Sequence, residues 1–123
     1  MATHNDFGKE AENQAVKFLE AKGYQILDRN WVFQKAEIDI VAEFEGIIVV
    51  TEVKARSYNT LIEPQEAVTK TKIKSIVMCS DFFMNERKID KEVRFDIITV
   101  LPDEQGILQL NHIEDAFQSF DAN

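Results

Sequence analysis

The segment "AEIDIVAEFEGIIVVTEVKAR", from Ala36 to Arg56, decides the fold of this chain. Two runs of β-branched and other apolar residues flank the dipeptide Glu45-Gly46. Two extended runs separated by such a dipeptide are typical of antiparallel strands joined by a tight turn. We therefore expect a β-hairpin over residues 37–56, with the strands "EIDIVAEF" and "IIVVTEVKAR".

Charged side chains interrupt this hairpin at positions where the strands are otherwise apolar. Because side chains alternate between the two faces of a strand, Glu37 and Asp39 share a face, as do Glu52 and Lys54. A two-residue turn places Asp39 opposite Glu52, with β-carbons about 4.5–5.5 Å apart, and Glu37 opposite Lys54. A slip of one residue would send these groups to opposite faces.

Two neighbouring carboxylates repel each other and raise each other's pKa. A hard divalent cation relieves that repulsion, and Mg²⁺ is often held by only one or two carboxylates together with substrate phosphate. The adjacent Lys54 is suited to orienting a water or balancing phosphate charge. The pattern favours metal-assisted hydrolysis of a phosphodiester, while a solvated face with cross-strand ion pairs remains an open alternative.

The rest of the chain predicts one domain, residues 1–123, with the element order αβββαββα. The fold class is α/β, a mixed sheet flanked by helices. Besides the hairpin we expect a helix from Asn5 or Asp6 to Gly23, a strand over 24–33, a helix from Pro64 to about Glu86, strands over 91–101 and 107–113, and a short helix over 113–120.

Two polar residues fall within the apolar arcs of the predicted helices. Glu12 points close to Val16 and Leu19, so its carboxylate must be paired, ligated or extended to solvent. Lys72 lies near Ile76 on the second helix, so its stem is expected to be covered and its ammonium directed at a partner. An edge position for Glu12 and a structural ion pair for Lys72 are the alternatives.

Composition excludes several classes of protein. The net charge is -8, which argues against nucleic-acid binding by bulk electrostatics, although residues 54–74 carry five basic side chains and two acidic ones. No apolar run is long enough to span a membrane, so no membrane partner is expected. The single cysteine, Cys79, favours a reducing, cytoplasmic setting, and His4 and His112 have no partner at metal-ligand spacing. Six aromatic residues are expected in the core: Trp31, Phe82, Phe83, Phe95, Phe117 and Phe120.

Five motifs occur in a specific order: "GKEAENQAVKFLEAKGYQILDRNW", "AEIDIVA", "VVTEVKARS", "PQEAVTKTKIKSI" and "VRFDIITV". In order and spacing they resemble the YraN-like uncharacterised bacterial proteins, from Gly8 to about Phe117. That family is similar to Holliday-junction resolvases and belongs to the restriction-endonuclease-like, PD-(D/E)xK, nuclease superfamily. The resemblance implies a restriction-endonuclease-like core, in agreement with the predicted element order.

The resemblance also implies roles for individual residues. Asp39 and Glu52 match the metal-binding acids, Lys54 matches the motif lysine, and Glu12 matches an acid from the first helix. The expected site residues are therefore Glu12, Asp39, Glu52 and Lys54 for catalysis, Asp39, Glu52 and the Val53 carbonyl for the metal, and Lys72 and Arg56 for the substrate. Glu37 lies in the family's Gly-Glu-Ile-Asp segment without a defined role. Ala11 and Ala36 stand where the family usually has glycine, and Ile38 where the superfamily has proline.

We therefore expect a DNA endonuclease that depends on Mg²⁺ (or Mn²⁺) and acts on branched or damaged DNA. Resolvases act as dimers because a junction presents two symmetric strands, so a homodimer is included in this expectation. Two alternatives remain open at this stage. One is a nuclease-fold module that binds nucleic acid with little or no chemistry, and the other is a protein-interaction partner whose acids form only ion pairs.

Overall fold

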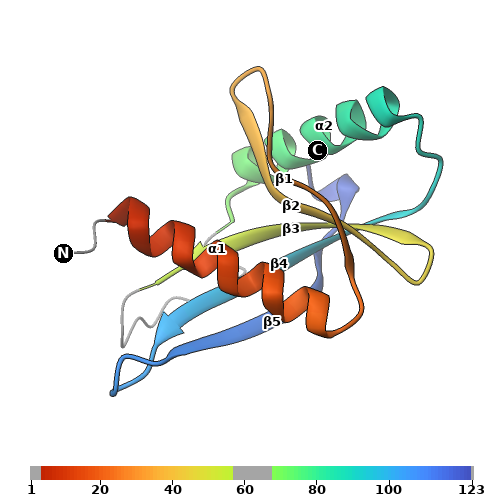
Figure 1. Cartoon of the computed structure of the whole chain (residues 1–123). Coiled ribbons are helices and arrows are strands. Elements are labelled where there is room, and N and C mark those ends of the chain that lie inside the picture. The colour runs from red at the N-terminus through yellow and green to blue at the C-terminus, as the bar shows by residue number, and fades with distance from the viewer. Residues whose placement is uncertain (1–3, 57–67, 123) are drawn as a thin grey trace.

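The computed structural model describes residues 4–56 and 68–122, and Figure 1 shows the path of the chain. The predicted Pro64 lies outside these residues. The elements in chain order are α1 (His4–Ala21), β1 (Gln25–Phe33), β2 (Ala36–Phe44), β3 (Ile47–Ala55), α2 (Lys70–Arg87), β4 (Val93–Pro102), β5 (Leu108–Phe117) and the 3₁₀ helix η2 (Ser119–Ala122).

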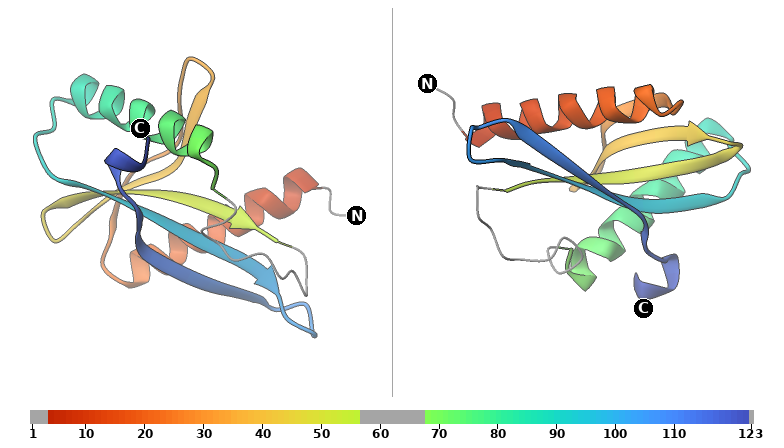
Figure 2. Two further views of the ribbon diagram at one scale, coloured as in Figure 1. Left: turned by 180° about the vertical axis from the view of Figure 1, so that it is seen from behind. Right: turned by 90° about the horizontal axis from the view of Figure 1, so that it is seen from below.

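The five strands form one mixed sheet in the order β1-β2-β3-β4-β5. All neighbours are antiparallel except β3 and β4, which are parallel and are separated in sequence by α2. The view from below in Figure 2 shows α1 on one face of the sheet and α2 on the other. The predicted α/β class and element order are confirmed, with a 3₁₀ turn as the last element. Neither long helix of the described chain has the hydrophobicity that crossing a membrane requires.

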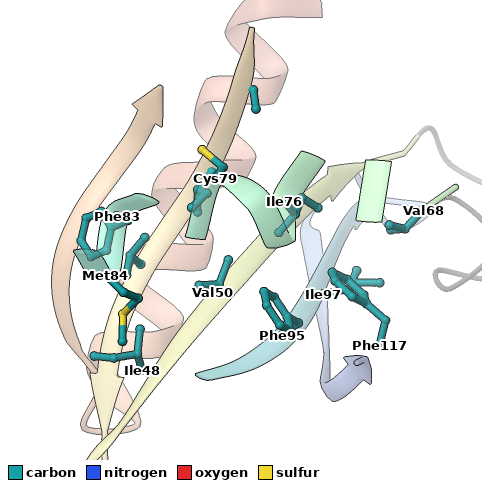
Figure 3. Packing of buried hydrophobic residues seen from close by; sticks show 13 residues of the cluster. Ile48, Val50, Val68, Ile76, Cys79, Phe83, Met84, Phe95, Ile97 and Phe117 are labelled. Carbon is teal, nitrogen blue, oxygen red and sulfur yellow. The ribbon is translucent and has the colours of Figure 1, made fainter. Parts of the chain in front are cut away.

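Strand β3 separates two hydrophobic cores because its side chains alternate between the faces of the sheet. Ile48 and Val50 pack in the core beneath α2, which Figure 3 shows together with Ile76 and Phe83 of that helix. Val49 belongs to the second core, beneath α1. This alternation fixes which charged residues of β3 lie on each side of the sheet.

The β2–β3 hairpin has the predicted turn. Glu45 and Gly46 both have positive φ, at 50° and 83°, as a two-residue turn that matches strand twist requires. The ladder runs in the predicted register from Phe44–Ile47 to Ile40–Thr51 and ends there. Beyond this point β2 pairs only with β1, and Figure 1 shows the β1–β2 hairpin projecting past the sheet beside α2. The two strands β2 and β3 thus form a fork.

Strand β2 changes the orientation of its side chains at the fork. Ile38 packs in the core beneath α2, whereas Ile40, two residues later, packs in the core beneath α1. A regular strand would place both residues on one face. Asp39 lies between them, at the point where the strand leaves β3.

The second helix begins later than the sequence pattern predicts. Thr69 is the N-cap of α2, with an extended backbone (φ −74°, ψ 163°), and its hydroxyl accepts a hydrogen bond from the Lys72 amide. A threonine cap satisfies an amide that the first turn leaves unpaired, which sets the start of the helix. At the other end Lys88 adopts the left-handed conformation and closes it.

The short last helix was predicted at the wrong position, over residues 113–120, and the structure has a 3₁₀ helix over Ser119–Ala122 instead. Residues through Phe117 extend β5, and Phe117 stacks on Phe95 with ring centroids 5.2 Å apart. Pairing with β4 and aromatic packing override the local helical spacing. Phe82, predicted to be in the core, is 42% exposed and stacks on Phe33 at the surface.

Candidate functional site

The fork between β2 and β3 is bridged by a side chain. Asp39 Oδ2 accepts a hydrogen bond of 2.8 Å from the backbone amide of Val53. In an uninterrupted ladder that amide would be paired with backbone, so the carboxylate replaces a missing rung. The bond holds Asp39 at the vertex of the fork and leaves its second oxygen, Oδ1, with no hydrogen-bond partner among the described residues.

A cavity of about 470 Å³ opens beside Asp39, within the range typical of ligand sites. It lies between α1 and the fork, and its lining combines acidic, basic and small side chains. The lining residues are Gly8, Lys9, Glu12, Arg29, Asn30, Glu37, Asp39, Val53 and Ala55. Three carboxylates therefore share one cavity with two cations.

Among the acids that line the cavity, Asp39 has a strongly raised pKa. Burial raises the pKa of Asp39 to about 7, with further contributions from the charges of Glu52, Glu12 and Glu37, while the Val53 hydrogen bond opposes them. This carboxyl group is accordingly poised between its two protonation states at neutral pH. A positive ion placed beside it would favour the charged form.

Glu12, on the sheet-facing side of α1, reaches the cavity and is held by donors from β1. Its Oε1 accepts hydrogen bonds from Arg29 Nε at 3.3 Å, Arg29 Nη2 at 3.1 Å and Asn30 Nδ2 at 2.8 Å. The Glu12 side chain is only 13% exposed. The predicted alternative of an edge residue reaching solvent is therefore wrong, and Glu12 is paired instead.

Glu52 lies next to the fork, on the side of α2. Its Oε1 is 3.4 Å from Lys54 Nζ on the same strand and 3.5 Å from Lys72 Nζ on α2. The three residues form an ion cluster in which a nearly buried carboxylate meets two ammonium groups. Lys72 thus forms an ion pair, which was the open alternative to a substrate contact.

The predicted cross-strand pairs do not form in the expected manner. Because the ladder ends at Ile40–Thr51, Asp39 does not stand directly opposite Glu52 as a ladder partner. Glu37 pairs with Val32 of β1 rather than with β3. The divergence of the strands at the fork is the physical reason. Asp39 lines the cavity, whereas the Glu52 carboxylate pairs with Lys54 and with Lys72 of α2.

Arg56 does not line the cavity, although the neighbouring Ala55 does. Its guanidinium Nη1 donates to the Ala55 carbonyl at 3.2 Å, and its amide donates to Val100 on β4. Of the predicted site residues, the structure brings Glu12, Asp39 and Val53 to the cavity lining. Glu52, Lys54 and Lys72 do not line it and form an ion cluster of their own.

Sequence reasoning missed Lys9, Arg29 and Asn30, which also line the cavity. A signal for two of them was present in "YQILDRNWVF", where polar residues occur in the middle of a predicted strand. Their common target on a distant helix depends on tertiary packing, which strand periodicity does not encode.

The donor set of the fork suits a hard cation. In residues 4–56 and 68–122, no group of three or more His, Cys, Asp or Glu side chains is arranged to hold a metal ion. The donors in the cavity lining are the Asp39 oxygen without a hydrogen-bond partner among the described residues and the carboxylates of Glu12 and Glu37, and Val53 belongs to the same lining. Oxygen donors in this small number fit Mg²⁺ better than zinc, because Mg²⁺ retains waters and binds substrate phosphate.

A fully buried aspartate, Asp96 on β4, belongs to a separate polar network. Arg94 donates to both of its oxygens, at 2.9 and 2.8 Å, and the Asp115 amide donates at 2.9 Å. His112 Nε2 lies 2.7 Å from Asp96, and Lys22 Nζ lies 2.9 Å from the other ring nitrogen. Since an ammonium only donates, His112 accepts at Nδ1 and donates from Nε2. The partners of His112 are thus hydrogen-bonding and ionic, Asp96 and Lys22.

Comparisons with known proteins agree over nearly the whole chain. The model of a family described as "Uncharacterised protein family UPF0102" matches residues 11–100. A UPF0102 protein of Flavobacterium psychrophilum is 47% identical over 120 residues, which covers 98% of this chain and 100% of the relative. A UPF0102 protein of Bacteroides thetaiotaomicron is 48% identical over 117 residues, covering 95% and 96% of the two chains. One from Christiangramia forsetii is 40% identical over 120 residues, covering 98% and 100%.

Proposed function

The chain belongs to the uncharacterised family UPF0102, and we propose that it is a Mg²⁺-dependent endonuclease that hydrolyses phosphodiester bonds in DNA. The observation that carries this proposal is Asp39. Its carboxyl group is held at the vertex of the fork, and burial together with neighbouring acids raises its pKa to about 7. A nearby cation would stabilise the charged form of such a carboxyl group, as expected of a metal ligand.

The proposed roles follow from the positions of the side chains. Asp39 and the Val53 carbonyl hold the cation at the vertex, and Glu52 completes the set from the side of α2. A bound Mg²⁺ would polarise the phosphate and stabilise the charge that develops on its oxygens. Lys54, 3.4 Å from Glu52, orients the attacking water.

The remaining charged residues of the site have supporting roles. Glu12 extends the acidic set from α1. Lys72 and Arg56 contact the DNA backbone. Local contacts of this kind reconcile DNA binding with a net charge of -8, because a few lysines and arginines near the site replace a broad basic surface.

The proposed substrate is branched DNA. The proposed active form is a homodimer, because a four-way junction presents two equivalent strands. Cleavage of linear, nicked and four-way DNAs with Mg²⁺ or Mn²⁺ tests the activity. We expect cation-dependent cleavage by the wild type and none by Asp39→Ala or Glu52→Ala. Equal cleavage by all three proteins would refute the assignment of the site, and sedimentation in solution tests the dimer.

A second candidate function is DNA binding without hydrolysis, which the ion cluster of Glu52 favours. Two lysines already compensate the Glu52 charge, as in a purely structural cluster. Calorimetry separates the two functions. DNA binding that ignores Mg²⁺ and is unchanged in Glu52→Gln would support the binding module and contradict the nuclease.

A further inference from the structure

One oxygen of Glu12 receives every hydrogen bond made to this side chain within the described residues. Arg29 donates two bonds and Asn30 donates one, all to Oε1, and the Asn30 bond is the shortest at 2.8 Å. Arg29 is itself held, because its Nη2 donates to Asn13 on α1 at 2.6 Å. The Oε2 oxygen of Glu12 therefore has no hydrogen bond within the described residues, and Glu12 lines the cavity.

The backbone of β1 is adapted to make this contact. Asn30 has φ of 53°, the left-handed conformation that L-residues rarely adopt inside a strand and that asparagine tolerates better than most. The pairs Arg29–Ile40 and Trp31–Ile38 bracket it, so Asn30 lies opposite Asp39. The irregular residue of β1 and the vertex of the fork thus occupy the same level of the sheet. Backbone strain at such a position accompanies functional sites.

We propose that Asn30 and Arg29 are positioning residues, which hold Glu12 with Oε1 committed to β1 and Oε2 presented to the cation. This inference rests on the proposed function, because it assigns a purpose to Glu12 in the same site. Asn30 orients the carboxylate without adding charge. Arg29 compensates the Glu12 charge while no cation is bound.

The physical basis is preorganisation of a flexible ligand. A free glutamate side chain loses rotational freedom when it binds a metal, whereas a glutamate already fixed by three hydrogen bonds loses little. Hydrogen-bond partners of metal ligands commonly change metal affinity by about 10–100-fold when they are removed. The effect should appear in cation affinity, independently of any cleavage.

Asn30→Gly is the informative substitution, because glycine keeps the left-handed backbone and removes only the amide. Gln34→Gly is its matched control. Gln34 lies just beyond β1 with φ of 56°, is exposed, and does not line the cavity. Calorimetric titration of the full chain with Mn²⁺ should show affinity about 10-fold weaker in Asn30→Gly and unchanged in Gln34→Gly. Both variants should melt close to the wild type.

A double-mutant cycle identifies the residue through which Asn30 acts. In a Glu12→Gln background the carboxylate is absent, so adding Asn30→Gly should change Mn²⁺ affinity by less than about 2-fold. An undiminished loss in that background would overturn the proposal, since Asn30 would then act through another group.

The outcomes separate this inference from the proposed function. A wild type that binds Mn²⁺ through Asp39 but is indifferent to Asn30→Gly contradicts the positioning role and leaves the nuclease proposal intact. Mn²⁺ affinity that is equal in wild type and Asp39→Asn contradicts the cation site and the positioning role with it. Loss in Asn30→Gly that depends on Glu12 supports the inference.

Discussion

Asp39 and Asp96 are aspartates on β2 and β4 of one sheet, the first half-buried and the second fully buried, and their surroundings give them opposite properties. Asp96 is fully buried, and although burial alone would raise its pKa, hydrogen bonds from His112 and Arg94 hold that pKa below the ordinary value. Asp39 has one backbone donor and a set of acidic neighbours, and its pKa rises to about 7. Burial is common to both, so the partners decide the charge.

This difference distinguishes a structural carboxylate from a candidate ligand. Asp96 joins β4 and β5 through partners that consume its hydrogen-bonding capacity, and nothing remains for a ligand. Asp39 keeps an oxygen without a partner among the described residues, beside a cavity. Lys9 and Arg29 line the same cavity, but within the described residues neither forms an ion pair with Asp39, and Arg29 pairs with Glu12 instead. This is the physical case for a cation.

The largest expected effect concerns chemistry at Asp39. Asp39→Asn keeps an oxygen that can accept the Val53 hydrogen bond and removes the negative charge. We expect the rate of Mg²⁺-dependent DNA cleavage to fall by about 1,000-fold, equivalent to about 4 kcal/mol of transition-state stabilisation. Asp28→Asn is the matched control, because Asp28 pairs with Arg87 outside the cavity lining, and its rate should change by less than about 2-fold. If Asp39→Asn retained a tenth of the wild-type rate, Asp39 would lack the ligand role that distinguishes it from Asp96.

The next largest effect is on stability at Asp96. Asp96→Asn leaves the largely buried Arg94 without its charged partner, so the free energy of unfolding should fall by about 3 kcal/mol. Urea unfolding monitored by circular dichroism measures this change. Glu114→Gln serves as the comparison, because Glu114 is 52% exposed and lies 3.9 Å from the same arginine, and should lose no more than about 0.5 kcal/mol. A fall of less than about 1 kcal/mol in the free energy of unfolding of Asp96→Asn would contradict the structural role of Asp96.

The pH dependence of stability should differ in sign at the two positions. In the folded protein Asp39 binds its proton up to a pH of about 7, compared with an ordinary value of 3.8, so the folded state holds more protons between these limits. Its contribution to stability is therefore present below about pH 4 and lost as pH rises through 7. Without added cation, Asp39→Asn should gain about 2 kcal/mol over the wild type between pH 5 and 8, since solvent at the cavity screens part of the shift. An identical pH profile for the two proteins in urea titrations would contradict the raised pKa.

Asp96 should affect the pH dependence of stability in the opposite direction. Because its pKa is lowered in the folded state, its contribution is present above the ordinary value and is lost as pH falls through the folded value. The acid limb of the unfolding profile should therefore flatten when Asp96 is replaced.

The smallest effect is expected at Lys72. Its ion pair with Glu52 belongs neither to the Asp96 network nor to the cavity lining around Asp39. Lys72→Met should change the free energy of unfolding by less than about 1 kcal/mol, because the lysine side chain is 39% exposed. If Lys72 contacts DNA phosphate, log-log plots of DNA affinity against salt should become shallower by about one unit. An unchanged salt slope would leave Lys72 as a partner of Glu52 alone.

The sequence predicted the hairpin because its turn and strands are local features. Alternation of apolar residues and the Glu45-Gly46 dipeptide are sufficient to define it. The extended form of residues 113–117 was not predictable in this way, since it depends on pairing with β4 and on stacking of Phe117 against Phe95. Tertiary contacts there outweigh the helical spacing of the apolar residues.

The candidate site was predictable in part for the same reason. Asp39 and Glu52 are recognisable as acids within apolar strands, and Glu12 as an acid on an apolar helix face. The fork could not be predicted, because it requires the end of the β2–β3 ladder and the left-handed Asn30 at the same level. The Asp96 network left a comparable signal, Arg94 and Asp96 within "VRFDIITV", but its partners Tyr24 and His112 are distant in sequence.

The most direct test of Asp39 as a cation ligand is a pH titration followed at its carboxyl carbon by nuclear magnetic resonance, with and without Mg²⁺. The midpoint should lie near pH 7 in the absence of the ion and fall by at least one unit when Mg²⁺ is added. A midpoint near the ordinary value of 3.8 that ignores Mg²⁺ would contradict the assignment.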